Sequence, residues 1–183
     1  LDNMDSRLLS KDQLLTYTIL SSYINTLLSS DGLELYDQPL STTLGIQSQL
    51  PVLLTEYAFY DKEDVEHYLT LLSDIDRYFE QILAFEKERS AAGLFMTDTC
   101  ADEIISQAQP YLLSAEHNLM GTEFNAKIDA MEGLNAEEKK AFKEQNQQVV
   151  TEHFIPAYKA LLEGLEALKG TGTNAEGICQ FPD

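Results

Sequence analysis

Three histidines are the first side chains to examine for chemistry, because each directly follows a glutamate. The pairs are Glu66-His67, Glu116-His117 and Glu152-His153. Catalytic zinc in peptidases is commonly held by two histidines four positions apart on one helix, with a glutamate between them as general base. The nearest two histidines here are about 36 positions apart, so no single helix can build that site. We therefore expect solvated or hydrogen-bonded helix histidines, with Glu63 one turn before His67 as an ion-pair partner.

Carboxylates and nucleophiles form no recognisable catalytic arrangement either. The carboxylate clusters are Glu63, Asp64 and Glu66; Asp74 and Asp76; and Glu86 and Glu88. None has the glycine-containing spacing of a calcium-binding loop, so we predict helix caps and solvent-facing surfaces. A Gly-x-Ser-x-Gly nucleophile motif is absent. Cys100 lies between Asp98 and Asp102, which favour its neutral thiol, and the distant Cys179 fits a second separate thiol better than a disulfide partner.

The charge of the chain limits its partners. Twelve Lys and Arg against 31 Asp and Glu give a formal net charge of −19 over 183 residues. Such a surface repels phosphate backbones and anionic lipid, so nucleic acid is not an expected partner. No apolar run approaches the roughly 20 residues that a membrane-spanning helix needs. The length suits one domain, or one lobe of a larger protein.

Apolar residues recur at three- and four-residue spacing along most of the chain, which indicates amphipathic helices. We predict an all-α bundle of about six to seven such helices, one lobe of a larger helical protein, with one long C-terminal helix kinked at Pro156. The expected helices are residues 11–30, 51–60, 62–72, 74–92, 98–110, 112–131 and 136–169.

Individual residues predict where several elements begin and end. Ser10, Asp61 and Ser73 are expected N-caps, and either Thr97 or Thr99 is expected to begin the helix that ends near Pro110. Pro51 suits the first turn of a helix, and Gly93 suits a helix C-terminus. Residues 33–36 favour a short strand. We predict one helical lobe over residues 1–170, and a linker over residues 171–183 that leads into a further segment.

Four stretches carry a family resemblance. They are GIQSQLPVLLTEY, DVEHYLTLLSDIDRYFEQILAFEKERSAAGLFM, FIPAYKALLEGLEAL and NAEGICQFPD. Their order and spacing resemble the N-terminal region of the bacterial family called domain of unknown function 885, over roughly residues 40–183. The resemblance implies a helix-rich, zinc metallopeptidase-like protein with an extracytoplasmic or lipoprotein location. The resemblance also implies that the linker 171–183 leads into a C-terminal catalytic lobe that is absent from this sequence. The family's zinc motif, of the His-Glu-x-x-Pro-Gly-His kind, would lie in that lobe. No position here matches those ligands, so we expect no cofactor in this chain.

On this resemblance the chain is a non-catalytic lobe that forms one wall of a peptide-binding cleft. Its expected partners are its own C-terminal lobe and peptides. The predicted substrate-binding residues are Gln47 and Gln49 in a polar loop and the adjacent Glu56 and Tyr57. The alternative is a helical binding or scaffolding domain without enzymatic activity, whose acidic surface recruits a basic partner. A reading frame that continues into a histidine–glutamate zinc motif favours the first hypothesis, and a stop near Asp183 favours the second.

Overall fold

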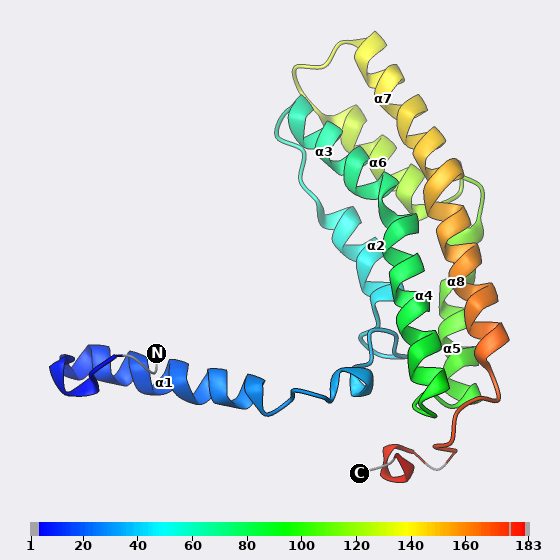
Figure 1. Cartoon of the computed structure of the whole chain (residues 1–183). Coiled ribbons are helices and arrows are strands. Elements are labelled where there is room, and N and C mark those ends of the chain that lie inside the picture. The colour runs from blue at the N-terminus through cyan, green and yellow to red at the C-terminus, as the bar shows by residue number, and fades with distance from the viewer. Residues whose placement is uncertain (1–3, 176, 182–183) are drawn as a thin grey trace. The chain divides into compact units, whose positions relative to one another are not determined.

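The computed structural model describes residues 4–175 and 177–181, and every regular element in them is helical. The chain divides into two compact units, Leu1–Asp37 and Gln38–Asp183. Figure 1 shows the first unit with α1 (Lys11–Leu28) and short 3-10 turns, and the second as a bundle of packed helices. The bundle contains α2 (Ile46–Glu56), α3 (Lys62–Ser73), α4 (Ile75–Ala91), α5 (Asp98–Ala108), α6 (Leu119–Ala130), α7 (Ala136–Val149) and α8 (Ile155–Leu168). The predicted all-α class is confirmed.

The first unit is a capped helix that buries nothing. Ser10 accepts a hydrogen bond from the backbone N–H of Gln13 (3.3 Å), and the Gln13 side chain accepts one from the backbone N–H of Ser10 (2.9 Å). This reciprocal cap confirms the predicted start of α1. No residue of α1 is buried, although it carries a row of leucines, isoleucines and tyrosines. The strand predicted at residues 33–36 is wrong, since Glu34–Tyr36 forms a 3-10 turn.

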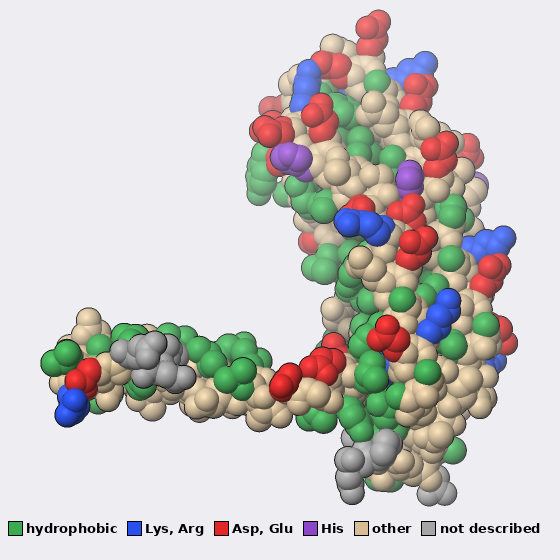
Figure 2. Space-filling view, viewed as in Figure 1, with side chains coloured by type: hydrophobic (Ala, Val, Ile, Leu, Met, Phe, Trp, Pro, Cys, Tyr) green, Lys and Arg blue, Asp and Glu red, His purple; other side chains and the backbone are tan. Residues whose placement is uncertain are grey.

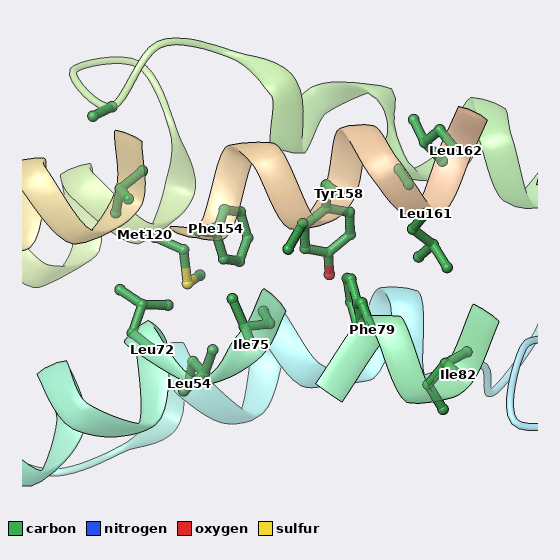
Figure 3. Packing of buried hydrophobic residues seen from close by; sticks show 14 of the residues in the cluster. Leu54, Leu72, Ile75, Phe79, Ile82, Met120, Phe154, Tyr158, Leu161 and Leu162 are labelled. Atoms are coloured by element: carbon green, nitrogen blue, oxygen red, sulfur yellow. The ribbon is translucent and has the colours of Figure 1, made fainter. Parts of the chain in front are cut away.

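The core of the second unit takes buried side chains from α2, α3, α4, α5, α6 and α8, and α4 packs closely on α8. Tyr158 of α8 points into the core, with its ring centroid 4.8 Å from that of Phe79 and 4.7 Å from that of Phe154 (Figure 3). Gly164 lets the two helices approach closely, because a Cβ at this position would lie 2.4 Å from a methyl carbon of Leu83. Edge-to-face and tilted aromatic pairs of this kind add to the stabilisation from burial alone.

The long C-terminal helix is kinked as predicted, through a π-helical turn. The π-helix η4 (Val150–Phe154) joins α7 to α8. Pro156 has no N–H to donate to the residue four positions before it, and the N–H of Ile155 instead bonds to the carbonyl of Val150, five positions back. The wider π-helical turn accommodates the proline, so the chain bends and continues as a helix.

Helix α2 begins earlier than the sequence indicated. It starts at Ile46, so Pro51 lies inside the helix and not in its first turn. A proline inside a helix leaves the carbonyl four residues earlier without its usual donor, and here that carbonyl belongs to Gln47. The hydroxyl of Tyr158 donates to the Gln47 oxygen at 2.7 Å. The missing backbone bond is thereby replaced by a bond that ties α2 to α8.

Two other predicted helix starts differ. Ser73 is the last residue of α3, and Asp74 precedes α4 without a side-chain cap, so the two helices are nearly continuous. The helix expected from residue 112 begins only at Leu119. Asn118 caps it by accepting from the N–H of Met120, while its amide donates to the carbonyls of Tyr111 (2.7 Å) and Leu113 (3.2 Å). By contrast, the cap at Asp61 is found as predicted, and of the two threonines expected to begin α5 it is Thr97 that caps it.

The most consequential correction concerns Glu86, which we predicted on a solvent-facing surface. Its carboxylate is fully buried and accepts two hydrogen bonds from the Nη1 of Arg89, at 2.9 and 3.1 Å. A charged residue at the edge of an apolar stripe can turn inward when its partner lies three positions along the same helix.

The segment after α8 is attached to the bundle. The hydroxyl of Thr173 donates to the carbonyl of Gly93 (2.7 Å), and the N–H of Gly170 donates to the carboxylate of Asp98 (2.7 Å). Gly93 itself has a φ of +76° and ends α4, as its sequence position predicted. The first residues of the predicted linker 171–183 therefore pack on the turn between α4 and α5, while residues 176, 182 and 183 lie outside the described residues.

Candidate binding groove

An apolar groove runs between α2 and the junction of α3 with α4. Its volume is about 380 Å³. The lining side chains are Leu50, Leu53, Leu54 and Tyr57 from α2 and its C-terminus, and Leu71, Asp74, Ile75 and Tyr78 from α3 and α4. Leu53 is 62% exposed, Leu71 54% and Tyr78 40%, which is unusual for side chains of this size. Hydrophobic side chains reach the surface of the bundle among acidic ones in Figure 2.

The helical repeat of the sequence builds both walls of this groove. Along α2 the groove positions step by three, one and three, from Leu50 to Tyr57, which places them on one side of a helix. The positions across the α3–α4 junction, Leu71, Asp74, Ile75 and Tyr78, follow the same spacing. Leu54 and Ile75 are buried and form the floor, because they also belong to the core cluster.

The end of the groove is held in place by aromatic packing and by one lysine. The Tyr57 ring lies 6.1 Å from Phe59 and 6.0 Å from Tyr68, centroid to centroid. Lys127 of α6 donates to the carbonyls of Thr55 and Tyr57, the latter at 2.7 Å, and lies over the Phe59 ring. A cation at these carbonyls complements the negative end of the α2 dipole. Burial lowers the pKa of Lys127, although Glu56 and Glu123 oppose that shift.

The α4 side of the groove has a polar edge. Hydrogen bonds from Arg77 hold the pKa of Asp74 below its ordinary value. Asp74 therefore stays anionic at neutral pH and is already bound to Arg77. Asp76, which does not line the groove, lies 2.8 Å from the Nδ1 of His153, and this hydrogen bond lowers the pKa of the Asp76 carboxyl.

The four predicted site residues occupy three kinds of position. Tyr57 lines the groove. Gln49 and Glu56 are exposed on the outer face of α2, on either side of Leu53. Gln47 is fully buried. Its amide donates to the carbonyl of Ser41 (2.6 Å) and to the side chain of Gln107 (3.3 Å), so it holds the loop before α2 against α5.

Sequence reasoning missed three residues that shape this region. Gln107 secures the loop by donating to the carbonyl of Thr42 (2.8 Å). Tyr158 bonds α2 from the opposite side, and burial raises the pKa of its phenol. Lys127 holds the C-terminal end of α2 by donating to the carbonyls of Thr55 and Tyr57. Only Tyr158 had a signal in the sequence, since a proline four residues after Gln47 leaves a carbonyl that needs a donor from elsewhere.

The histidines lie apart on the surface of the bundle. His67 is 3.8 Å from Glu63, the ion pair expected from their spacing, and the Nδ1 of His117 lies 3.1 Å from the hydroxyl of Ser114. Among the residues that the structure describes, no three His, Cys, Asp or Glu side chains are grouped as metal ligands would be. In the same residues, no helix is both long and apolar enough to cross a membrane.

Comparison with known proteins places the chain in a family. A solved structure described as "the putative lipoprotein from Colwellia psychrerythraea" matches with a TM-score of 0.75 at 18% sequence identity. The match covers 79% of this chain and 25% of the other, so the chain spans about a quarter of that protein. At this identity the likeness shows the fold. No curated protein matches. The family model described as "Bacterial protein of unknown function (DUF885)" matches residues 1–181, and the chain belongs to that family.

Proposed function

We propose that this chain is a non-catalytic helical lobe of a larger zinc-dependent peptidase and forms one wall of its peptide-binding cleft. The observation that carries the proposal is the open apolar groove of α2, α3 and α4, with Tyr57 at its end. A groove of this size and lining suits an apolar side chain of an extended peptide. The share of the solved relative that the chain covers supports a lobe of a longer protein.

In this proposal each part of the groove has one task. Leu53, Leu71 and Tyr78 lose exposed apolar surface when a peptide side chain enters, which favours binding by about 25 cal/mol per Å² removed from water. Gln49 and Glu56 offer hydrogen-bonding groups to the peptide backbone along the outer face of α2. Gln47 is buried and acts indirectly, by holding the loop that precedes α2. Zinc and the general base belong to another part of the protein.

The test uses the full-length protein and a matched pair of variants. Leu53→Gln places an amide in the groove without disturbing the core, because Leu53 is already largely exposed. Val52→Gln makes the same kind of change at the neighbouring position, which is 52% exposed and does not line the groove. We expect Leu53→Gln to raise KM for peptides with apolar side chains while Val52→Gln leaves it unchanged. Equal KM values for both variants and the parent protein would show that the groove does not bind the peptide.

The second candidate, a binding or scaffolding domain without enzymatic activity, is favoured by the exposed apolar row on α1. Eight of its large apolar side chains are exposed and none of its residues is buried. An apolar surface of this extent in a soluble protein commonly marks an interaction site. Stable complex formation by the full-length protein, with no hydrolysis of any peptide in a diverse library, would favour this function over the peptidase lobe.

A further inference from the structure

The exposed apolar side chains of α1 lie on opposite sides of the helix. Nine residues make about two and a half turns of an α-helix, so positions nine apart point in opposite directions. Three such pairs are apolar and exposed at both positions: Leu14 and Tyr23, Leu15 and Ile24, and Ile19 and Leu28. Ile19 is 59% exposed and Leu28 is 66% exposed. A surface helix keeps a polar side opposite its apolar one, whereas apolar residues on opposite sides are typical of a helix in a protein interior.

The polar residues of α1 also suit burial. No Asp, Glu, Lys, Arg or His lies between Gln13 and Ser30, although the chain has 31 acidic and 12 basic residues. Three threonine hydroxyls donate to carbonyls of the helix itself: Thr16 to Asp12 (3.1 Å), Thr18 to Leu14 (2.8 Å) and Thr26 to Ser22 (3.0 Å). A hydroxyl bonded within its own helix can leave water without losing that hydrogen bond. The surfaces of α3 and α7, by contrast, carry exposed ions such as Glu63 and Lys140.

Helix α1 needs packing to be stable. Most of the stability of a helix in a protein comes from tertiary contacts, because a helix alone in water is marginal. The 18 residues of α1 include five β-branched ones and no alanine, a composition of low helix propensity. None of them is buried within this chain, so the capping box at Ser10 and other local bonds are all that this chain supplies. The packing that α1 needs must come from outside the chain.

The distribution of these side chains decides what can cover α1. Pairing with the α1 of a second copy covers one side of each helix, and a lipid surface also covers one side. Helices that bind lipid surfaces are rich in Lys and Arg, and α1 has Lys11 as its one basic residue. Two copies would also bring together two chains of net charge −19. A layer of helices in a longer protein can cover both sides, and this chain spans 25% of its solved relative.

We propose that α1 inserts between two apolar helical walls of the part of the full-length protein that lies outside these 183 residues. One wall receives Leu15 and Ile19, which lie one turn apart on the same side, and the other wall receives Ile24 and Leu28. The apolar surface of α1 thereby holds the two parts of the protein together. This inference shares with the proposed function only the premise that the chain belongs to a longer protein.

The test is amide hydrogen exchange, followed by mass spectrometry, in this chain and in the full-length protein. The α1 amides of the full-length protein should exchange at least about 100-fold more slowly than those of the chain alone, because opening a packed helix costs more than opening an unpacked one. This protection should be independent of protein concentration. Equal exchange in both proteins would overturn the proposal. So would protection that rises with concentration, which indicates a second copy, or that appears only with phosphatidylcholine vesicles, which indicates a lipid surface.

Two substitutions on opposite sides of α1 distinguish two walls from one. Ile19→Asp and Leu28→Asp should each reduce the protection of α1 in the full-length protein at least about tenfold, because each places a carboxylate in an apolar wall. In the chain alone both positions are exposed, so neither substitution should change the thermal unfolding of the bundle. The matched control is Leu113→Asp, at a 50% exposed position outside α1, which should leave the protection unchanged.

Full protection of α1 in either Ile19→Asp or Leu28→Asp would show that one side of the helix stays in water, and would overturn the proposal. Hydrogen exchange is measured without any substrate. A protein that hydrolyses no peptide but protects α1 would therefore remove the proposed function and leave this inference standing, and an active peptidase with an unprotected α1 would do the reverse.

Discussion

The two units of this chain carry the same kind of sequence pattern and use it differently. In Gln38–Asp183 the apolar residues of α4 and α8 are buried against each other. In Leu1–Asp37 the equally regular apolar row of α1 stays exposed, and the hydrophobic side chains are visible along the helix in Figure 2. Periodicity therefore predicts that a helix forms and which face is apolar. It does not predict what covers that face.

The comparison is tested most strongly by truncating one apolar side chain in each unit. Phe154→Ala should cost about 3–5 kcal/mol of unfolding free energy, because Phe154 is fully buried and its removal leaves a cavity. Ile19→Ala on α1 should change stability by less than about 0.5 kcal/mol, because Ile19 is 59% exposed. Urea denaturation of both variants measures the difference. Equal losses would show that α1 is covered in solution and would contradict the contrast between the units.

The buried ion pair extends the comparison to charges. Arg89→Met should destabilise the bundle by about 3–5 kcal/mol, because it leaves the Glu86 carboxylate buried without this partner. Replacing both residues by apolar ones should cost much less than the sum of the single changes. Arg77→Met, which breaks an exposed pair with Asp74 on the same helix, is the control and should have a far smaller effect. Chemical denaturation of the single variants at Glu86 and at Arg89, of the double variant and of Arg77→Met provides the comparison, and simple additivity at Glu86 and Arg89 would contradict their coupling.

The bond between α8 and α2 should have an intermediate effect. Tyr158→Phe keeps the packing of the ring but leaves the carbonyl of Gln47 without a donor, at a cost of about 1–3 kcal/mol. Tyr23→Phe on α1 removes an exposed hydroxyl and should be close to neutral. Thermal unfolding distinguishes the two. A neutral Tyr158→Phe would mean that water or another group satisfies that carbonyl.

The smallest expected effect is a dependence of stability on pH at the His153–Asp76 contact. The pKa of Asp76 is lowered in the folded state from its ordinary value of 3.8. The contact therefore contributes stability above that value, and the contribution is lost as the pH falls through the lowered pKa. Asp76→Asn should be less stable than the parent at pH 7 by under about 1 kcal/mol, since the pair is partly exposed. The difference should vanish in acid, and a constant difference down to pH 2 would contradict this assignment.

The sequence predicted the helices well because capping residues and apolar spacing act locally. Ser10, Asp61 and Thr97 each satisfy backbone donors within one turn, so their positions alone locate a helix start. The position of Pro51 in its helix was misread because a distant residue makes an internal proline tolerable there: the Tyr158 hydroxyl donates to the carbonyl that Pro51 leaves without a donor. Glu86 was misread for a different reason. Its partner Arg89 lies only three positions along the same helix, but the sequence did not indicate that the bundle buries this pair.

The candidate sites were harder to predict than the helices. Of the residues named from the sequence, Tyr57 lines the groove because the α2 repeat places it beside Leu53 and Leu54. The opposite wall comes from the α3–α4 junction, and no local pattern indicates that it faces α2.

The central claim, that this chain is a helical lobe whose reactive centre lies elsewhere in the protein, is tested most directly by one paired measurement. Zinc content and peptide hydrolysis are measured on this chain and on the full-length protein. We predict stoichiometric zinc and hydrolysis for the full-length protein and neither for the chain alone. Peptide cleavage by the isolated chain with a tightly bound metal ion, or a full-length protein that binds no zinc and cleaves no peptide, would contradict the claim.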